Sequence, residues 1–128
     1  MKIRKSNPEN VAPPVAQYSH VAVIPKDAEL VVLSGQIGND KDGILPSDIE
    51  TQFANAFGNI RSIFESEGVN LNNVFKINFW FTEQLDRKTY LEEWNKFSTQ
   101  SPPATTLAYV SALARPEIKV EIEAWAAK

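Results

Sequence analysis

The chain has 128 residues, of which 43% are hydrophobic and 23% are charged. This length and composition predict one globular domain, residues 1–128, with a single hydrophobic core. The formal net charge is -3 and no basic stripe is visible, which argues against a protein that mainly binds nucleic acid. One histidine and no cysteine exclude disulfides and thiolate nucleophiles and leave too few ligands for a typical transition-metal site, so we expect no metal and no cofactor.

Two further features of the sequence concern the cellular location and the N-terminal segment. It has no apolar run of membrane-spanning length and no signal-peptide core, so we expect a cytoplasmic protein with no membrane partner. Its one basic cluster, Lys2-Ile3-Arg4-Lys5, is interpreted as a solvated tail.

The first predicted elements are two short strands, residues 18–24 and 30–37, which are rich in β-branched side chains. Pro25-Lys26-Asp27 lies between them and favours a hairpin. After a polar turn, Ser47 stands three residues before Glu50, the spacing of a capping box at the start of a helix.

An apolar stripe at helical spacing follows this capping box and predicts a helix that packs on the core. Gly68 is expected to end that helix, because glycine adopts the left-handed conformation common just after a helix. The stripe consists of Ile49, Phe53, Phe57, Ile60 and Phe64.

The C-terminal half predicts a strand, a helix and two more strands. Residues 74–82 alternate strictly, which is typical of a strand with one buried face. A helix is expected over residues 86–97 and cannot continue through Pro102-Pro103. Strands are expected over residues 104–112 and 118–126. In the first strand, the side chains expected to lie under the helices are Phe75, Ile77, Phe79 and Phe81, and those expected on the other face are Lys76, Asn78 and Trp80.

The element order β-β-α-β-α-β-β predicts an α+β domain in which two helices cover one face of a mixed sheet. Two helices cannot cover both faces, and the uncovered face mixes large aromatic side chains with carboxylates. Such a face is costly in a monomer, so we expect a partner surface to cover it. Alternation in the last strand adds Lys119, Glu121, Glu123 and Trp125 to this face.

Five segments, in order along the chain, resemble signatures of the RidA/YjgF/YER057c family. They are Tyr18-Ser19-His20, Leu33-Ser34-Gly35-Gln36-Ile37, Asn59-Ile60-Arg61-Ser62-Ile63-Phe64 with Gly68, Pro102-Pro103-Ala104-Thr105-Thr106-Leu107, and Ile118-Lys119-Val120-Glu121-Ile122-Glu123-Ala124. The resemblance implies a chorismate-mutase-like fold. It also implies a homotrimer whose partner is itself, with a small-molecule ligand bound in each cleft between adjacent subunits.

The resemblance also implies a set of site residues. Glu121 matches the carboxylate that holds an attacking water, and the binding positions are Tyr18, Ser34, Gly35, Thr105 and Leu107. Each position keeps a structural interpretation beside the functional one. Tyr18 and Glu121 also suit a subunit interface, and Gly35 also suits close packing within a strand. The sole histidine, His20, is interpreted as a hydrogen-bonded structural residue.

Family chemistry is the hydrolysis of reactive enamines and imines, such as 2-aminoacrylate, to a ketoacid and ammonia. In active relatives an arginine binds the substrate carboxylate, and Thr105 stands at its position. A hydroxyl carries neither the charge nor the two-pronged donor geometry of a guanidinium. Leu91 similarly stands where many relatives have a cleft asparagine. We therefore expect weak or altered deaminase activity.

Three functions stay open. The first is a small-molecule-binding or chaperone-like trimer with a retained cleft. The second is a hydrolase that uses a water held by Glu121 on a different imine or a non-carboxylate substrate. The third, ranked last, is the endoribonuclease or translation-inhibitor activity associated with the family, because the sequence has no basic groove, histidine pair or metal cluster.

Overall fold

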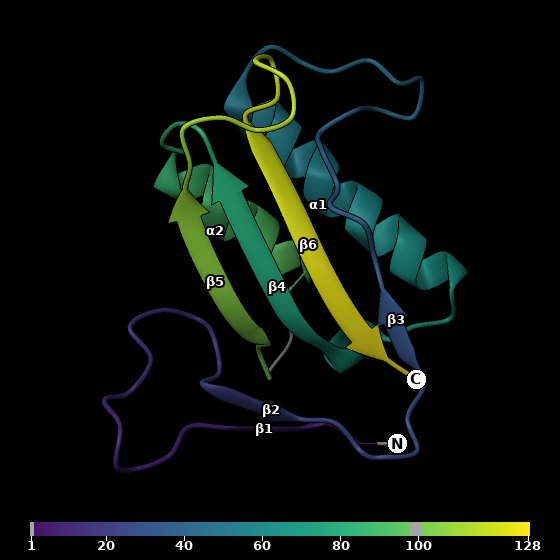
Figure 1. The fold of residues 1–128 in the computed structure, drawn as a ribbon, viewed down its shortest axis with the longest axis vertical. Helices are drawn as coiled ribbons and strands as arrows, with labels where there is room; N and C mark the ends of the chain where they lie inside the picture. Colours follow the sequence, from purple (N-terminus) through teal and green to yellow (C-terminus); the bar gives the residue numbers. More distant parts are fainter. Residues whose placement is uncertain (1, 98–100) are drawn as a thin grey trace.

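The computed structural model describes residues 2–97 and 101–128 as two helices packed on one face of a mixed sheet (Figure 1). The sheet has the order β3-β6-β4-β5, with β4 and β5 parallel and the other neighbours antiparallel. This confirms the predicted α+β class and the helices on a single face. The elements are β1 (Arg4–Ser6), β2 (Val21–Val23), β3 (Leu30–Val32), α1 (Ile49–Ser66), the 3-10 turn η1 (Leu71–Asn73), β4 (Val74–Phe81), α2 (Arg87–Phe97), β5 (Ala104–Tyr109) and β6 (Val120–Ala127).

Helix α1 buries the apolar stripe that the sequence predicts. Phe53 and Phe57 are fully buried and pack edge-to-face, and both rings also contact Phe79 of β4. Gly68 follows the helix with φ of +71°, a left-handed conformation that suits glycine at this position. The helix therefore ends where its pattern indicates.

The predicted capping box is wrong by one residue. The N-cap is Asp48, not Ser47, and its carboxylate accepts hydrogen bonds from the backbone N–H and the hydroxyl of Thr51 at 2.9 and 2.7 Å. Asp is as good an N-cap as Ser, and placing the cap at Asp48 brings Ile49 to the first helical position, where it is buried. These hydrogen bonds lower the pKa of Asp48.

The predicted hairpin between residues 18–24 and 30–37 is also wrong. Strand β2 pairs with β1, and β3 pairs with the edge of β6, so the two predicted strands lie in different sheets. The basic cluster is accordingly not a solvated tail: Ile3 is buried, and the Lys5 ammonium donates to the carbonyls of Asn72 and Ser101 at 3.0 and 2.6 Å. Burial lowers the pKa of Lys5 to about 8. A three-residue strand is too short for its periodicity to be recognised in the sequence.

One residue of β4 departs from the predicted alternation. Val74 pairs with Ala126 and Lys76 pairs with Trp125, so Phe75 is the extra residue of a bulge. Phe75 is only half-buried and does not lie under the helices, which corrects the expected core. Beyond the bulge, Ile77, Phe79 and Phe81 are buried as predicted.

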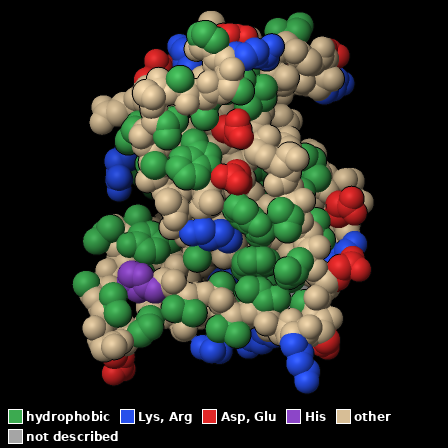
Figure 2. Space-filling view, viewed as in Figure 1, with side chains coloured by type: hydrophobic (Ala, Val, Ile, Leu, Met, Phe, Trp, Pro, Cys, Tyr) green, Lys and Arg blue, Asp and Glu red, His purple; other side chains and the backbone are tan. Residues whose placement is uncertain are grey.

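No described helix lies on the sheet face opposite α1 and α2, and we call this face the open face (Figures 1 and 2). Figure 2 shows acidic and basic side chains scattered among apolar ones on this side of the molecule. The strand register places on it Lys76, Asn78, Trp80, Glu121, Glu123 and Trp125. Among the described residues, no helix is long and apolar enough to cross a membrane.

Candidate functional site

Glu121 and Glu123 share the open face but have different surroundings. The indole N–H of Trp80 donates to the Glu123 carboxylate at 2.6 Å, so Glu123 is engaged within its own chain. The Glu121 side chain forms no hydrogen bond or ion pair with any residue that the structure describes. The carboxylate available to act on a water or a ligand is therefore that of Glu121.

Gly35 lies directly beneath this carboxylate. A side-chain Cβ at Gly35 would collide with the Glu121 carboxyl group, so the glycine permits its close approach to the backbone of the neighbouring segment. Ser34 precedes it with an exposed side chain, and its carbonyl accepts a hydrogen bond from the Gln36 amide at 3.0 Å. The structure thus brings Ser34, Gly35 and Glu121 together.

Thr105 and Leu107 lie on the opposite side of the sheet from Glu121. In the parallel β4–β5 pair, Thr105 is aligned with Ile77 and Leu107 with Phe79, and both of these β4 residues face the helices. The intervening Thr106 is on the open face, where its hydroxyl accepts a hydrogen bond from Lys76 at 3.0 Å. Within one chain, the predicted site residues therefore form two separate groups.

Leu107 lines a hollow of about 350 Å³ between β5 and the start of α2. A second hollow of about 320 Å³ shares part of this lining, including Arg87 and Tyr90, and extends along α2 past Leu91 to Trp94. We call the two together the Arg87 hollow. The lining of the first is Ala16, Phe81, Gln84, Leu85, Arg87, Tyr90, Leu107 and Tyr109.

Arg87 is not among the site residues that the sequence predicts. No pattern in the chain marks it, because the hollow is assembled from the loop before β2, the beginning of α2 and strand β5. The only available signal was its position at the start of a predicted helix, which is common for a solvated arginine.

Tyr18 lies in the loop that runs alongside the beginning of β5. The following residue, Ser19, fixes this loop: its backbone N–H donates to the carbonyl of Pro103 at 3.1 Å and its hydroxyl donates to that of Pro102 at 2.7 Å. The Tyr18 hydroxyl accepts from the backbone N–H of Val15 at 3.3 Å. Tyr18 therefore lies in a loop that is fastened to the segment just before β5.

His20 is held by the loop around it. Its Nε2 lies 2.7 Å from the carbonyl oxygen of Ala12, its backbone N–H donates to the Asn7 side chain at 2.8 Å, and its ring packs edge-to-face on Tyr18. These contacts support the structural interpretation. The described residues contain no group of three or more His, Cys, Asp or Glu side chains that could hold a metal ion.

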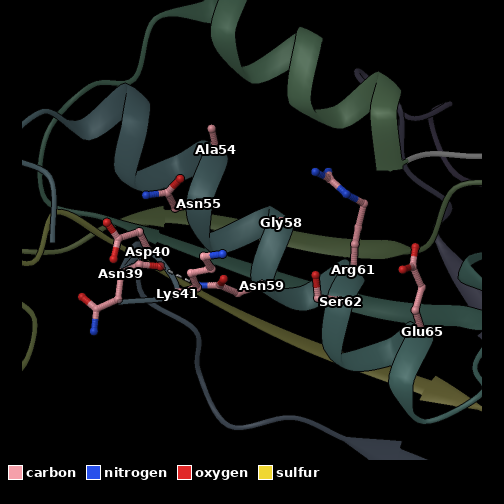
Figure 3. A pocket seen from close by; sticks show the side chains of 10 residues that line it. All are labelled: Asn39, Asp40, Lys41, Ala54, Asn55, Gly58, Asn59, Arg61, Ser62 and Glu65. Atoms are coloured by element: carbon pink, nitrogen blue, oxygen red, sulfur yellow. Dashed lines mark hydrogen bonds between the residues drawn. The ribbon is translucent and has the colours of Figure 1, made fainter. Parts of the chain in front are cut away.

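A third, polar hollow of about 460 Å³ lies between α1 and the loop before it (Figure 3). Its amides fasten the loop to the helix: Asn59 donates to the carbonyls of Ile37 and Asn39 at 3.2 and 3.0 Å, and Asn55 donates to that of Gly38 at 3.0 Å. In Figure 3 the Arg61 side chain extends away from this loop. These amide hydrogen bonds hold the loop in place on α1.

Comparison with known sequences finds relatives over nearly the whole chain. A family model described as endoribonuclease L-PSP matches residues 9–128. A RutC family protein of Pyrococcus horikoshii is 32% identical over 122 residues, which cover 94% of each chain. The 2-iminobutanoate/2-iminopropanoate deaminase of Escherichia coli is 28% identical over 103 residues, covering 77% of this chain and 80% of the deaminase.

Solved structures agree with these relatives. The Rid family protein YyfB from Yersinia pestis, described as of unknown function, superposes over the full length of both chains with a TM-score of 0.86 at 23% identity. RidA from an Antarctic Psychrobacter has a TM-score of 0.68 at 27% identity and covers 96% of this chain and 98% of its own. The first likeness shows the fold.

Proposed function

This chain belongs to the RidA/YjgF/YER057c family, and from that premise we propose that it is a homotrimer with a small-molecule-binding cleft between adjacent subunits. The observation that carries the proposal is the separation of the site residues into two groups. Glu121 and Gly35 lie on the open face, whereas Thr105 and Leu107 lie on the helix side of β5. One small ligand cannot contact both groups through the sheet of a single chain. A second copy that sets its β5 edge against the open face would bring the two groups together.

The chemistry that fits such a cleft is hydrolysis of an imine by a water that Glu121 holds and deprotonates. The Escherichia coli relative is named for this reaction on 2-iminobutanoate and 2-iminopropanoate. In this chain Thr105 supplies no cation for the substrate carboxylate. A charge-assisted hydrogen bond contributes about 1.5–3 kcal/mol, which corresponds to roughly a ten- to hundredfold effect on transition-state binding. We therefore expect weak activity toward small imino acids.

A second candidate is a hydrolase acting through Glu121 on a different imine or on a substrate without a carboxylate. The unpaired carboxylate of Glu121 favours it, because a general base needs a free acceptor and does not itself require the arginine. Endoribonuclease activity ranks last. Glu121 and Glu123 would repel phosphate groups on the open face, and the one histidine is engaged by backbone atoms.

The decisive experiment is a coupled assay in which an amino-acid oxidase or a pyridoxal-phosphate lyase generates the imine and its decay is followed. Thr105→Arg should accelerate hydrolysis of 2-aminoacrylate-derived imine by roughly ten- to a hundredfold, and only for substrates that carry a carboxylate. Thr105→Gln is the matched control, because it lengthens the side chain at the same position without adding a charge and should give no comparable gain. Wild-type protein as fast as the Escherichia coli deaminase would overturn the proposed role of Thr105.

A further inference from the structure

The Arg87 hollow contains one charged side chain in an otherwise neutral and largely apolar lining. Of the described residues that line it, only Arg87 carries a charge; the others are aromatic, aliphatic or amide side chains. Arg87 forms no ion pair with any described residue. The nearest carboxylate in sequence, that of Asp86, does not line the hollow and accepts hydrogen bonds from the backbone and hydroxyl of Thr89, both at 3.2 Å.

Neutral donors accompany this cation. The Tyr90 phenol is partly buried beside Arg87; burial raises the pKa of Tyr90 to about 12, and the guanidinium charge opposes that rise. Tyr90 is therefore a neutral hydroxyl donor at physiological pH. Tyr109, on the opposite wall, is 55% exposed and packs on Phe81. Trp94 is buried, and its indole N–H has no partner among the described residues.

Charge and shape together select a ligand. A guanidinium binds a carboxylate with two parallel hydrogen bonds, and the Leu85, Leu107 and Tyr109 side chains offer apolar surface to the remainder of the ligand. On the basis of the proposed function, we propose that Arg87 takes the carboxylate of a small ligand with an apolar or aromatic body, in place of a cation at position 105.

The position of Arg87 also sets the size of that ligand. The hollow is lined by Leu107 and Tyr109 of β5 but not by Thr105. Leu107 lies two residues, or about 7 Å, further along the strand than Thr105. We expect a ligand anchored at Arg87 to extend along this part of β5, where a hollow of about 350 Å³ has room for a larger molecule than a three- or four-carbon acid.

Calorimetric titration with phenylacetate, its uncharged amide phenylacetamide, and acetate tests this proposal. Wild-type protein should bind phenylacetate most tightly, because acetate lacks the apolar body and phenylacetamide lacks the charge. Arg87→Gln should weaken phenylacetate binding by roughly ten- to a hundredfold and leave phenylacetamide binding unchanged. Lys88→Gln is the matched control: Lys88 is the next residue, lies outside the hollow and pairs with Glu92, so this variant should bind as wild type does.

Circular dichroism and light scattering on each variant show whether the fold and assembly are retained. Equal affinities of the acid and the amide, or an Arg87→Gln variant that binds phenylacetate as tightly as wild type, would overturn the inference. These results would leave the proposed imine hydrolysis standing, since the coupled assay measures that reaction separately. Arg87-dependent phenylacetate binding by a protein that hydrolyses no imine would instead support the inference and contradict only the enzymatic proposal.

Discussion

At the scale of single residues, the two glutamates of β6 illustrate how neighbours on one sheet face take different roles. Period two puts both on the open face, and the sequence correctly predicts that much. Which of them is free depends on Trp80, whose indole reaches Glu123 and not Glu121. Predicting this hydrogen bond requires the register between β4 and β6, and the sequence does not show that these two strands are neighbours.

This difference predicts different effects of removing each charge. Glu121→Gln should lower kcat for the imine that wild-type protein hydrolyses fastest by at least about a hundredfold, because an amide cannot accept the proton of the attacking water. Glu123→Gln should change kcat by less than about threefold, since the amide oxygen still accepts from Trp80 and touches no reacting group. Steady-state kinetics of the two variants check this. A larger loss in Glu123→Gln than in Glu121→Gln would contradict the assignment.

Arg87 marks the limit of what residue patterns predict. Motif matching identifies positions that resemble a known site, and Gly35 and Glu121 indeed lie together. When another element supplies the cation of a site, no motif residue at the original arginine position indicates it. Arg87 and Leu107 stand twenty residues apart and become neighbours only because α2 packs beside β5.

At the scale of elements, long periodic segments are predictable and short ones are not. Helix α1 and strands β4 and β6 have enough residues for their periods to be evident, and the structure confirms them with small shifts at the ends. Strand β1 has three residues, and its pairing with β2 displaces the expected hairpin. The bulge at Phe75 is equally invisible, because one inserted residue becomes apparent only from the pairing on both sides.

Lys5 in strand β1 should make the free energy of unfolding depend on pH. Its ordinary pKa is 10.5 and burial lowers it to about 8, so between these values the unfolded chain binds more protons than the folded one. The free energy of unfolding should therefore rise with pH from about 8 to 10.5, while below pH 8 the full cost of burying the charged amine is present.

Urea unfolding of wild type and Lys5→Met at pH 7 and pH 10, at one protein concentration, isolates this effect. Wild type should gain stability relative to Lys5→Met on going to pH 10, because the variant has no group to titrate at this position. Lys2→Met is the matched control, since Lys2 is exposed, and its difference from wild type should not vary with pH. A pH-independent difference between wild type and Lys5→Met would show that the ammonium stays charged in the fold.

At the scale of the whole molecule, the open face leaves aromatic and apolar side chains partly exposed within one chain. Trp80 and Trp125 are only half-buried there, Val32 is 57% exposed beside Trp125, and the side-chain oxygen of Asn78 is buried without a partner among the described residues. Alternation in the sequence is enough to predict that another surface covers this face. It does not identify that surface, because the symmetry that relates copies of a chain leaves no periodic pattern in the sequence.

We predict that this cover is two further copies of the chain. Light scattering at micromolar concentration should return about three times the chain mass of 14.3 kDa, and acrylamide should quench Trp80 or Trp125 less than their exposure in a single chain would allow.

Val32→Asp should shift the mass toward the monomer, because a carboxylate buried against the apolar part of the interface has no partner. Ile44→Asp is the matched control: Ile44 is 64% exposed, in the loop before α1, and its replacement should leave the trimer intact. Wild-type protein that scatters as a monomer would contradict the assembly, and with it the cleft in which Glu121 of one copy meets Thr105 and Leu107 of another.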